Sequence, residues 1–411
     1  MISLIVNSVP NLSSEQANAD PIIFAKYLKS KGIKVNIISL FNKNYFSSDK
    51  SLEKYKENIK ENYKIDVIPI YYSKEKKLKK FINKFNNLFN YGQVLDENID
   101  EIQKKISFNL TKFKSKAVIN FFDIPILLAG KRITNKKIKI INYIGVYKTK
   151  LEILRREIYK KNIKLWWRIP LAYIYEKKSK LFYSNRFICS DLNLCPALDT
   201  YEELERKNNI KNLKLTKPLS QIREAKSNNS KIQKKIKIFM IGNLRSSFME
   251  EALEDIYKNR LIYENLFNKY KFKIDVVGKF KPRNNFFKKK NNWIKFHGWK
   301  EKVDSFYKNC DILLVPNKYQ LAPRTKILEA MSAGKCVVTY SSNIYSHKEF
   351  KNFKNIVYGN NTEEFFYNLE YVIKNHNERN KIGNNARKIY NQQYNPLKIM
   401  NYNYKLIKAI L

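Results

Sequence analysis

The segment from residue 310 to residue 340, CDILLVPNKYQLAPRTKILEAMSAGKCVVTY, predicts a strand, a loop, a helix and a second strand in succession. The first strand is the short apolar run 311–316, which ends at a proline. Pro323 suits the first turn of a helix, and the apolar residues after it recur at helical spacing. Gly334 is a natural helix end, and 336–340 is the next buried strand. A unit of this kind is typical of a parallel α/β sheet.

The start of this helix also predicts a binding site. A helix that begins just past the carboxyl end of a parallel strand presents free backbone N–H groups and its positive dipole end, which attract an anion such as phosphate. Arg324 and Lys326 add fixed positive charge at this point. Glu329, one turn further along, can accept hydrogen bonds from a sugar diol, as the acidic residue of other nucleotide-binding folds does.

The rest of the chain alternates strands and helices, which predicts the α/β class with parallel sheets covered by helices on both faces. A polar stretch at 224–235 interrupts the alternation and reads as a loop or linker. The predicted strands are 3–9, 35–40, 65–70, 117–122, 138–144, 187–190, 236–241, 273–277, 293–296, 311–316 and 336–340. The predicted helices are 20–31, 125–131, 248–270, 302–309, 324–333, 362–375 and 396–411.

The segment around Glu329 resembles the donor-site motif of two-domain (GT-B) glycosyltransferases, especially the large retaining group known as family 4. The matching residues are Arg324, Thr325, Lys326, Glu329, Ala330, Met331, Gly334, Val337 and Val338. In that family the motif binds the diphosphate and the ribose of a sugar nucleotide. The alternative is an ordinary α/β helix with two polar positions, but the flanking segments also fit the family.

The resemblance also implies a domain arrangement. Two Rossmann-like domains face a cleft: residues 1–215 bind the acceptor and residues 216–395 bind the nucleotide sugar. The C-terminal helix, 396–411, is expected to cross back onto the N-terminal domain.

Two loops resemble the parts of the family that hold the diphosphate. Residues 236–253 read as a strand, Gly242 and a helix, and glycine allows a ligand to approach the backbone closely. The resemblance places Arg245 of this loop near the diphosphate. The run DVVGKF at 275–280 puts Lys279 at the carboxyl end of a strand, where ligands bind in open α/β sheets. A simple strand-to-helix turn is the alternative for the first loop.

A third loop, 296–299, resembles the part of the family that frames the nucleobase. It contains Phe296 and Gly298, and we interpret His297 between them as a wall of the base pocket rather than a catalytic residue. The loop 341–346 is expected on the same rim.

The chain departs from the family in several places. Many family-4 enzymes carry a second glutamate eight positions before the equivalent of Glu329, and here that position is Leu321. The N-terminal half has no histidine, and the usual Gly-Gly loop after the first strand is absent. Asp123 follows a predicted strand and is our candidate for a carboxylate on the acceptor side. Its alternative role is to cap a helix over 124–130.

The chemistry that the resemblance implies is transfer of a sugar from a nucleoside-diphosphate sugar, with retention of configuration. Negative charge builds on the leaving diphosphate, so preorganised positive groups are needed there. The predicted groups are Arg245, Lys279, Arg324, Lys326 and the helix N-terminus. The predicted catalytic residues are Lys326, Glu329 and Asp123. GT-B enzymes generally act without a bound divalent cation, and no acidic pair here has convincing metal spacing. The resemblance therefore implies that no metal or other cofactor is required beside the donor substrate.

The charge of the chain is extreme, with 80 Lys and Arg against 37 Asp and Glu, a net charge of +43. Such a field attracts phosphates, whether in anionic lipid, nucleic acid, nucleotide sugars or acidic glycans. A coding bias toward Lys, Asn, Ile, Tyr and Phe is a competing explanation. No nucleic-acid-binding motif is present, so we expect no specific nucleic acid partner. The four cysteines are scattered and are typical of a reducing compartment.

Two basic segments indicate an anionic membrane surface as a partner. Residues 73–89 place apolar side chains on one helical stripe among six lysines, although that stripe fits a protein core equally well. Residues 155–170 are basic and contain Trp166 and Trp167, whose rings suit either a lipid interface or packing inside the domain. No apolar run approaches the ~18 residues of a membrane span, and the first residues do not read as a leader. We therefore expect a cytoplasmic protein, peripheral on the inner face of the cytoplasmic membrane.

The leading hypothesis is an enzyme that glycosylates a glycan or lipid-linked acceptor in the synthesis of envelope polysaccharide or lipopolysaccharide. A GT-B-fold sugar-nucleotide epimerase is one alternative, although the acid–base residues that it needs are not evident. The other is a basic membrane- or nucleic-acid-binding protein on a degenerate GT-B scaffold.

Overall fold

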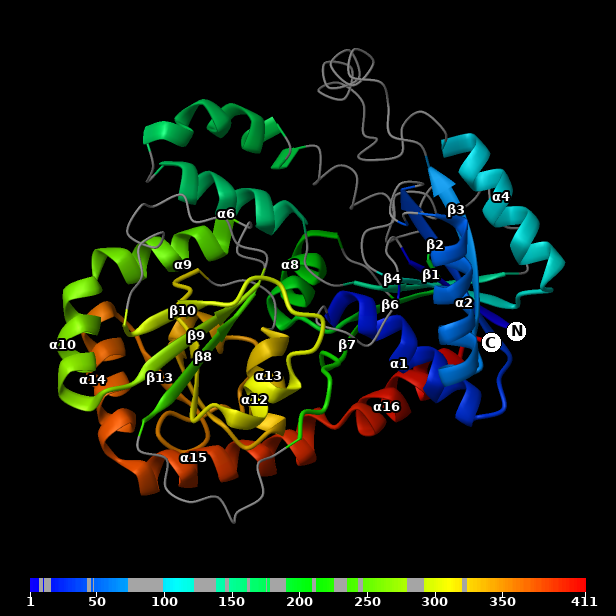
Figure 1. Ribbon diagram of the computed structural model, residues 1–411. Helices are drawn as coiled ribbons and strands as arrows, with labels where there is room; N and C mark the ends of the chain where they lie inside the picture. Colours follow the sequence, from blue (N-terminus) through cyan, green and yellow to red (C-terminus); the bar gives the residue numbers. More distant parts are fainter. Residues whose placement is uncertain are drawn as a thin grey trace. The chain divides into compact units, whose positions relative to one another are not determined.

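The computed structural model describes the chain in two compact units (Figure 1). The first unit comprises residues 1–217 and 397–411, and the second comprises 218–396. The residues described are 1–6, 10, 16–42, 46, 48–72, 99–121, 138–144, 148–160, 163–174, 176–177, 190–208, 212–224, 235–242, 247–278, 292–319 and 324–411.

The first unit is built on a seven-stranded sheet of order β3-β2-β1-β4-β5-β6-β7. The strands are β1 (Ile2–Val6), β2 (Val35–Asn42), β3 (Asp66–Tyr72), β4 (Ala117–Phe121), β5 (Lys139–Tyr143), β6 (Leu192–Cys195) and β7 (Leu213–Leu215). Every pair of neighbours is parallel. This arrangement confirms the predicted class.

The helices of the first unit include the C-terminal one. They are α1 (Gln16–Ser30), α2 (Asp49–Tyr63), α4 (Ile99–Lys112), α6 (Lys148–Lys160), α8 (Leu198–Asn208) and α16 (Pro396–Lys408), with a 3-10 turn at Ile163–Arg168. The hydroxyl of Tyr27 in α1 donates a hydrogen bond to Asn401 in α16. The Tyr27 ring also lies 6.1 Å from that of Tyr404, so α16 packs on α1 within the first unit.

The second unit has a six-stranded parallel sheet of order β10-β9-β8-β11-β12-β13. Its strands are β8 (Lys237–Ile241), β9 (Lys273–Val277), β10 (Ile294–Phe296), β11 (Ile312–Val315), β12 (Cys336–Tyr340) and β13 (Val357–Gly359). Its helices are α9 (Ser247–Lys258), α10 (Arg260–Tyr270), α12 (Asp304–Asn309), α13 (Thr325–Ser332), α14 (Thr362–Lys374) and α15 (His376–Ile389). A 3-10 turn at Ser341–Asn343 and a π-helical turn at Tyr390–Tyr394 complete it.

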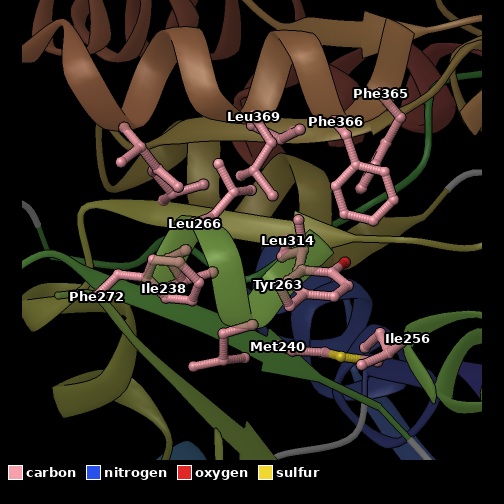
Figure 2. Packing of buried hydrophobic residues seen from close by; sticks show 14 of the residues in the cluster. Ile238, Met240, Ile256, Tyr263, Leu266, Phe272, Leu314, Phe365, Phe366 and Leu369 are labelled. Carbon is pink, nitrogen blue, oxygen red and sulfur yellow. The ribbon is translucent and has the colours of Figure 1, made fainter. Parts of the chain in front are cut away.

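Helices cover both faces of this second sheet. Side chains alternate along a strand, and Ile238 of β8 packs in one buried cluster with α9, α10 and α14. Its neighbour Phe239 packs in another cluster with α12 and α13. Figure 2 shows Phe366 of α14 pointing toward Tyr263 of α10, and the two ring centroids lie 5.0 Å apart.

One predicted element was placed wrongly. The single helix 248–270 is two helices, α9 and α10, because the chain turns at Asn259 between them. The strand predicted at 187–190 lies mostly outside the described residues, and the strand found next is β6, after Ser190. Polar side chains obscured β6: Asn193 accepts a buried hydrogen bond from Asn142 at 2.9 Å, so part of this strand is not apolar.

Candidate functional site

The strand order of the second unit reverses at β8, which pairs with β9 on one side and β11 on the other. In open α/β sheets, ligands bind outside the carboxyl ends of the strands at such a point. Gly242 follows β8 directly, and the loop after β11 leads into α13, which begins at Thr325. The predicted phosphate site is therefore at the reversal point of this sheet.

Lys326 brings its amine to this point. Its Nζ donates a hydrogen bond to the carbonyl of Ile241, the last residue of β8, and lies 3.8 Å from the Met249 sulfur. A Cβ on Gly242 would lie 3.0 Å from both Nζ and that sulfur. The absence of a side chain at Gly242 thus leaves room for Lys326. Burial and the nearby charge of Arg324 lower the pKa of Lys326 to about 7.

Arg324 stands at the N-cap position of α13 and is held by the rim of the sheet. Its Nε donates to Asn343 Oδ1 at 3.0 Å, and its Nη2 donates to the Tyr319 carbonyl at 3.3 Å. The amide of Asn343 donates in turn to the Asn317 carbonyl at 2.6 Å and to Thr339 Oγ1 at 3.0 Å. Burial lowers the pKa of Arg324 to about 10, and Glu251 opposes this shift. The predicted loop 341–346 does lie on this rim, and it supplies Asn343.

Glu329 is buried one turn into α13, and its carboxylate is already engaged. Oε2 accepts hydrogen bonds from Arg223 Nε at 3.0 Å and Nη2 at 2.8 Å. Tyr307 also donates its hydroxyl to this carboxylate. Burial raises the pKa of Glu329 and the Arg223 charge opposes the rise. The sequence did not point to Arg223, because it lies in a segment that reads as a loop and its partner is 106 residues away.

The predicted base-framing loop follows β10. Gly298 adopts a left-handed backbone with φ +66°, and its carbonyl accepts a hydrogen bond from Gly278 N–H at 2.9 Å. Phe296 packs against the hydrophobic core of the unit. His297 Nε2 lies 2.6 Å from Asp275 Oδ1, and its ring meets Phe306 edge-on, so its surroundings are defined by β9 and α12.

Several predicted features lie outside the described residues. They are Arg245, Lys279, Asp123, Leu321, and the segment 73–89. In the described ranges, no three His, Cys, Asp or Glu side chains are grouped so as to hold a metal ion. No helix there is long and apolar enough to cross a membrane.

Part of the second unit matches a known protein family. Residues 221–389 match the family model of glycosyl transferases group 1. No curated protein matches the sequence.

Solved glycosyltransferase structures share the fold over nearly the whole chain. TarM of S. aureus is 11% identical with a TM-score of 0.67, covering 98% of this chain and 99% of its own. Anabaena HepE, in complex with UDP-glucose, is 11% identical with a TM-score of 0.66 and 99% coverage of both chains. WaaG, a glycosyltransferase involved in lipopolysaccharide biosynthesis, is 12% identical with a TM-score of 0.64 and 99% coverage of both.

Proposed function

We propose that this chain, whose residues 221–389 match the family model of glycosyl transferases group 1, moves a sugar from a nucleoside-diphosphate sugar to a glycan or lipid-linked acceptor. The observation that carries the proposal is the meeting of two cations and a helix N-terminus at the reversal point of a parallel sheet. Lys326, Arg324 and the first turn of α13 form this site beside the close backbone turn at Gly242.

The chemistry follows from where charge develops. Cleavage of the bond to the anomeric carbon leaves negative charge on the diphosphate, and fixed cations that face it lower the barrier. Lys326 and Arg324 are held before the substrate arrives, so little reorganisation is needed. Glu329 accepts the ribose diol, and Arg245 and Lys279 add charge at the phosphates. We infer a retaining reaction without a metal, in which the diphosphate itself helps to deprotonate the acceptor and Asp123 assists.

The acceptor is proposed to be presented at a membrane. On the turn after α6, Trp166 and Trp167 are 53% and 64% exposed, and the Arg168 guanidinium lies 4.8 Å from the Trp167 ring. Exposed tryptophan beside cations is suited to the headgroup region of an anionic bilayer. We therefore propose a cytoplasmic enzyme of envelope polysaccharide or lipopolysaccharide synthesis, peripheral on the inner face of the cytoplasmic membrane.

The test is turnover of UDP-, GDP-, ADP-, CMP- and dTDP-linked sugars by the full chain, with and without a lipid extract as acceptor. We expect one nucleotide class to release its nucleotide, and Lys326→Met to reduce release at least tenfold. A sugar that is epimerised while still linked to its nucleotide would show the epimerase alternative. Release by none of the donors, together with tight binding to anionic vesicles, would favour a charge-driven binding protein.

A further inference from the structure

Arg223 is enclosed by the elements that build the donor site. The residue lies in the extended segment 218–224 that begins the second unit, and only 4% of it is exposed. Nε and Nη2 donate to Glu329, and Nη1 donates to Asp304 Oδ1 at 2.9 Å. Its guanidinium carbon stacks 5.2 Å from the centre of the Tyr307 ring. The Arg223 backbone N–H donates to Ser332 Oγ at 2.9 Å, which fixes the segment against α13.

This geometry is specific for a carboxylate. Nε and Nη2 of Arg223 converge on one carboxylate oxygen, Oε2, with charge-assisted hydrogen bonds that hold this oxygen in place. Tyr307 donates to the same group from α12. Glu329 therefore cannot turn freely, although its carboxylate retains acceptor capacity for further donors.

The charged and titratable groups around Glu329 come from each packed element. They are Lys326 on its own helix, Arg223 from the segment 218–224, Asp304 and Tyr307 from α12, and Tyr390 from the π-helical turn. Arg223 and Lys326 favour the ionised carboxylate, whereas Asp304 and burial favour the protonated form. Arg223 is the cation that donates hydrogen bonds to Glu329 among the described residues.

We propose that Arg223 is a positioning residue of the donor site, which holds the Glu329 carboxylate ionised and oriented to accept hydrogen bonds from the ribose diol. The inference rests on the proposed function, because Glu329 has this role only if the site binds a nucleotide that carries a ribose diol. Without Arg223, a buried carboxyl next to Asp304 takes up a proton more readily and then offers a donor where the diol needs an acceptor. Loss of Arg223 should therefore weaken the contribution of the diol to binding and leave the contribution of the phosphates unchanged.

The test compares two probes that differ only in the diol. The affinity of the 5′-diphosphate of uridine, guanosine or adenosine, whichever binds the wild type, is measured by calorimetry beside its 2′,3′-dideoxy form. Wild type should prefer the diol form, and Arg223→Gln should lose this preference by about tenfold while binding the dideoxy form unchanged. The loss of affinity for the diol form on acidification should also begin at a higher pH in Arg223→Gln. Arg223→Lys, which keeps the charge, should restore the pH dependence but only part of the preference.

Arg379→Gln is the matched control. Arg379 is also 4% exposed, but it donates to the backbone carbonyls of Val372 and Ile373 in α14 and not to Glu329. The Arg379→Gln variant should have a lower melting temperature and keep the wild-type preference for the diol form. Arg223 variants that weaken both probes equally, or that keep the wild-type preference, would overturn the positioning role. Binding of none of the diphosphates by the wild type would instead contradict the proposed function itself. If Arg223→Gln does not fold, the diol preference of Arg223→Lys tests the proposal alone. A preference equal to that of the wild type would then overturn the positioning role.

Discussion

At the scale of single residues, positive charge is concentrated at the start of α13. Neither Lys326 nor Arg324 forms a salt bridge with a side chain in the described part of the chain. Taking a cation out of water favours its neutral form, and a second cation nearby adds to this. Both effects act on Lys326, which explains a pKa of about 7 for a group that ordinarily titrates at 10.5.

Lys326 should therefore take up a proton when a diphosphate binds. The anion favours the ammonium form and raises the Lys326 pKa, so at pH 8 the mostly neutral amine of the free protein becomes charged in the complex. The affinity for the diphosphate should therefore fall as the pH rises above 7, by up to about tenfold per pH unit. Calorimetry at pH 8 in two buffers of different ionisation enthalpy measures the uptake. Lys326→Met should show none, and heats that are the same in both buffers for the wild type would contradict the account.

Gly242→Ala should impair binding with little effect on folding. The new Cβ would meet the flexible ends of Lys326 and Met249 at 3.0 Å, and these can move aside at small cost. Displacing the Lys326 amine should weaken nucleoside-diphosphate binding several-fold, while the melting temperature stays within a few degrees.

Gly32→Ala is the control, because it should reduce folding stability without affecting binding. Gly32 has φ +77° with open space around it, so alanine there costs about 1 kcal/mol of folding stability in strain and touches no predicted site. Calorimetry measures nucleoside-diphosphate binding by both variants, and thermal melts measure their stability. Equal loss of binding in the two would show that Gly242 acts only through stability.

At the scale of elements, α13 depends on a close contact with α15. A Cβ on Gly383 of α15 would lie 2.3 Å from the carbonyl oxygen of Gly334, just past the end of α13. Gly383→Ala forces backbone to move and should cost about 1–3 kcal/mol. Denaturant unfolding measures the loss. Asn384→Ala, on the exposed side of the same helix, should change stability by no more than about 0.5 kcal/mol, and an equal loss in both variants would refute the packing argument.

The elements that were predicted well are those whose own residues dictate them. Strand β12 was predicted at its observed bounds, because its run CVVTY is buried throughout. Helix α13 followed from apolar spacing, and Gly334 ends it with φ +70°. The site residues predicted on α13 depend on the same local pattern, and their roles stay a prediction.

The features that were missed depend on partners far away in the chain. Arg223 reads as a loop residue, and only folding brings it to Glu329 and Asp304. Asn343 likewise gains its role from Arg324 and Asn317. Strand β6 was not predicted, because the polar side chain of its Asn193 is hydrogen-bonded by a neighbouring strand, which the local pattern does not reveal.

At the scale of the whole molecule, the net charge of +43 and the exposed tryptophans predict binding to anionic vesicles. Trp166→Ala with Trp167→Ala should reduce sedimentation with phosphatidylglycerol vesicles several-fold, because both rings lose their place in the headgroup region. Raising salt from 0.05 to about 0.5 M should weaken binding further by screening. Tyr367→Ala removes an aromatic side chain that is 70% exposed in the second unit and serves as the control. Equal binding by the tryptophan variant and the wild type would contradict a role for this surface.

The central claim is that the start of α13 binds a nucleoside diphosphate, and thermal melting tests it most directly. The full chain and its Lys326→Met variant are melted with UDP-, GDP-, ADP-, CMP- and dTDP-linked sugars. A ligand that binds only the folded state raises the melting temperature. The account predicts that one nucleotide class stabilises the wild type and stabilises Lys326→Met much less. An absence of any shift in the wild type, or equal shifts in both proteins, would contradict it.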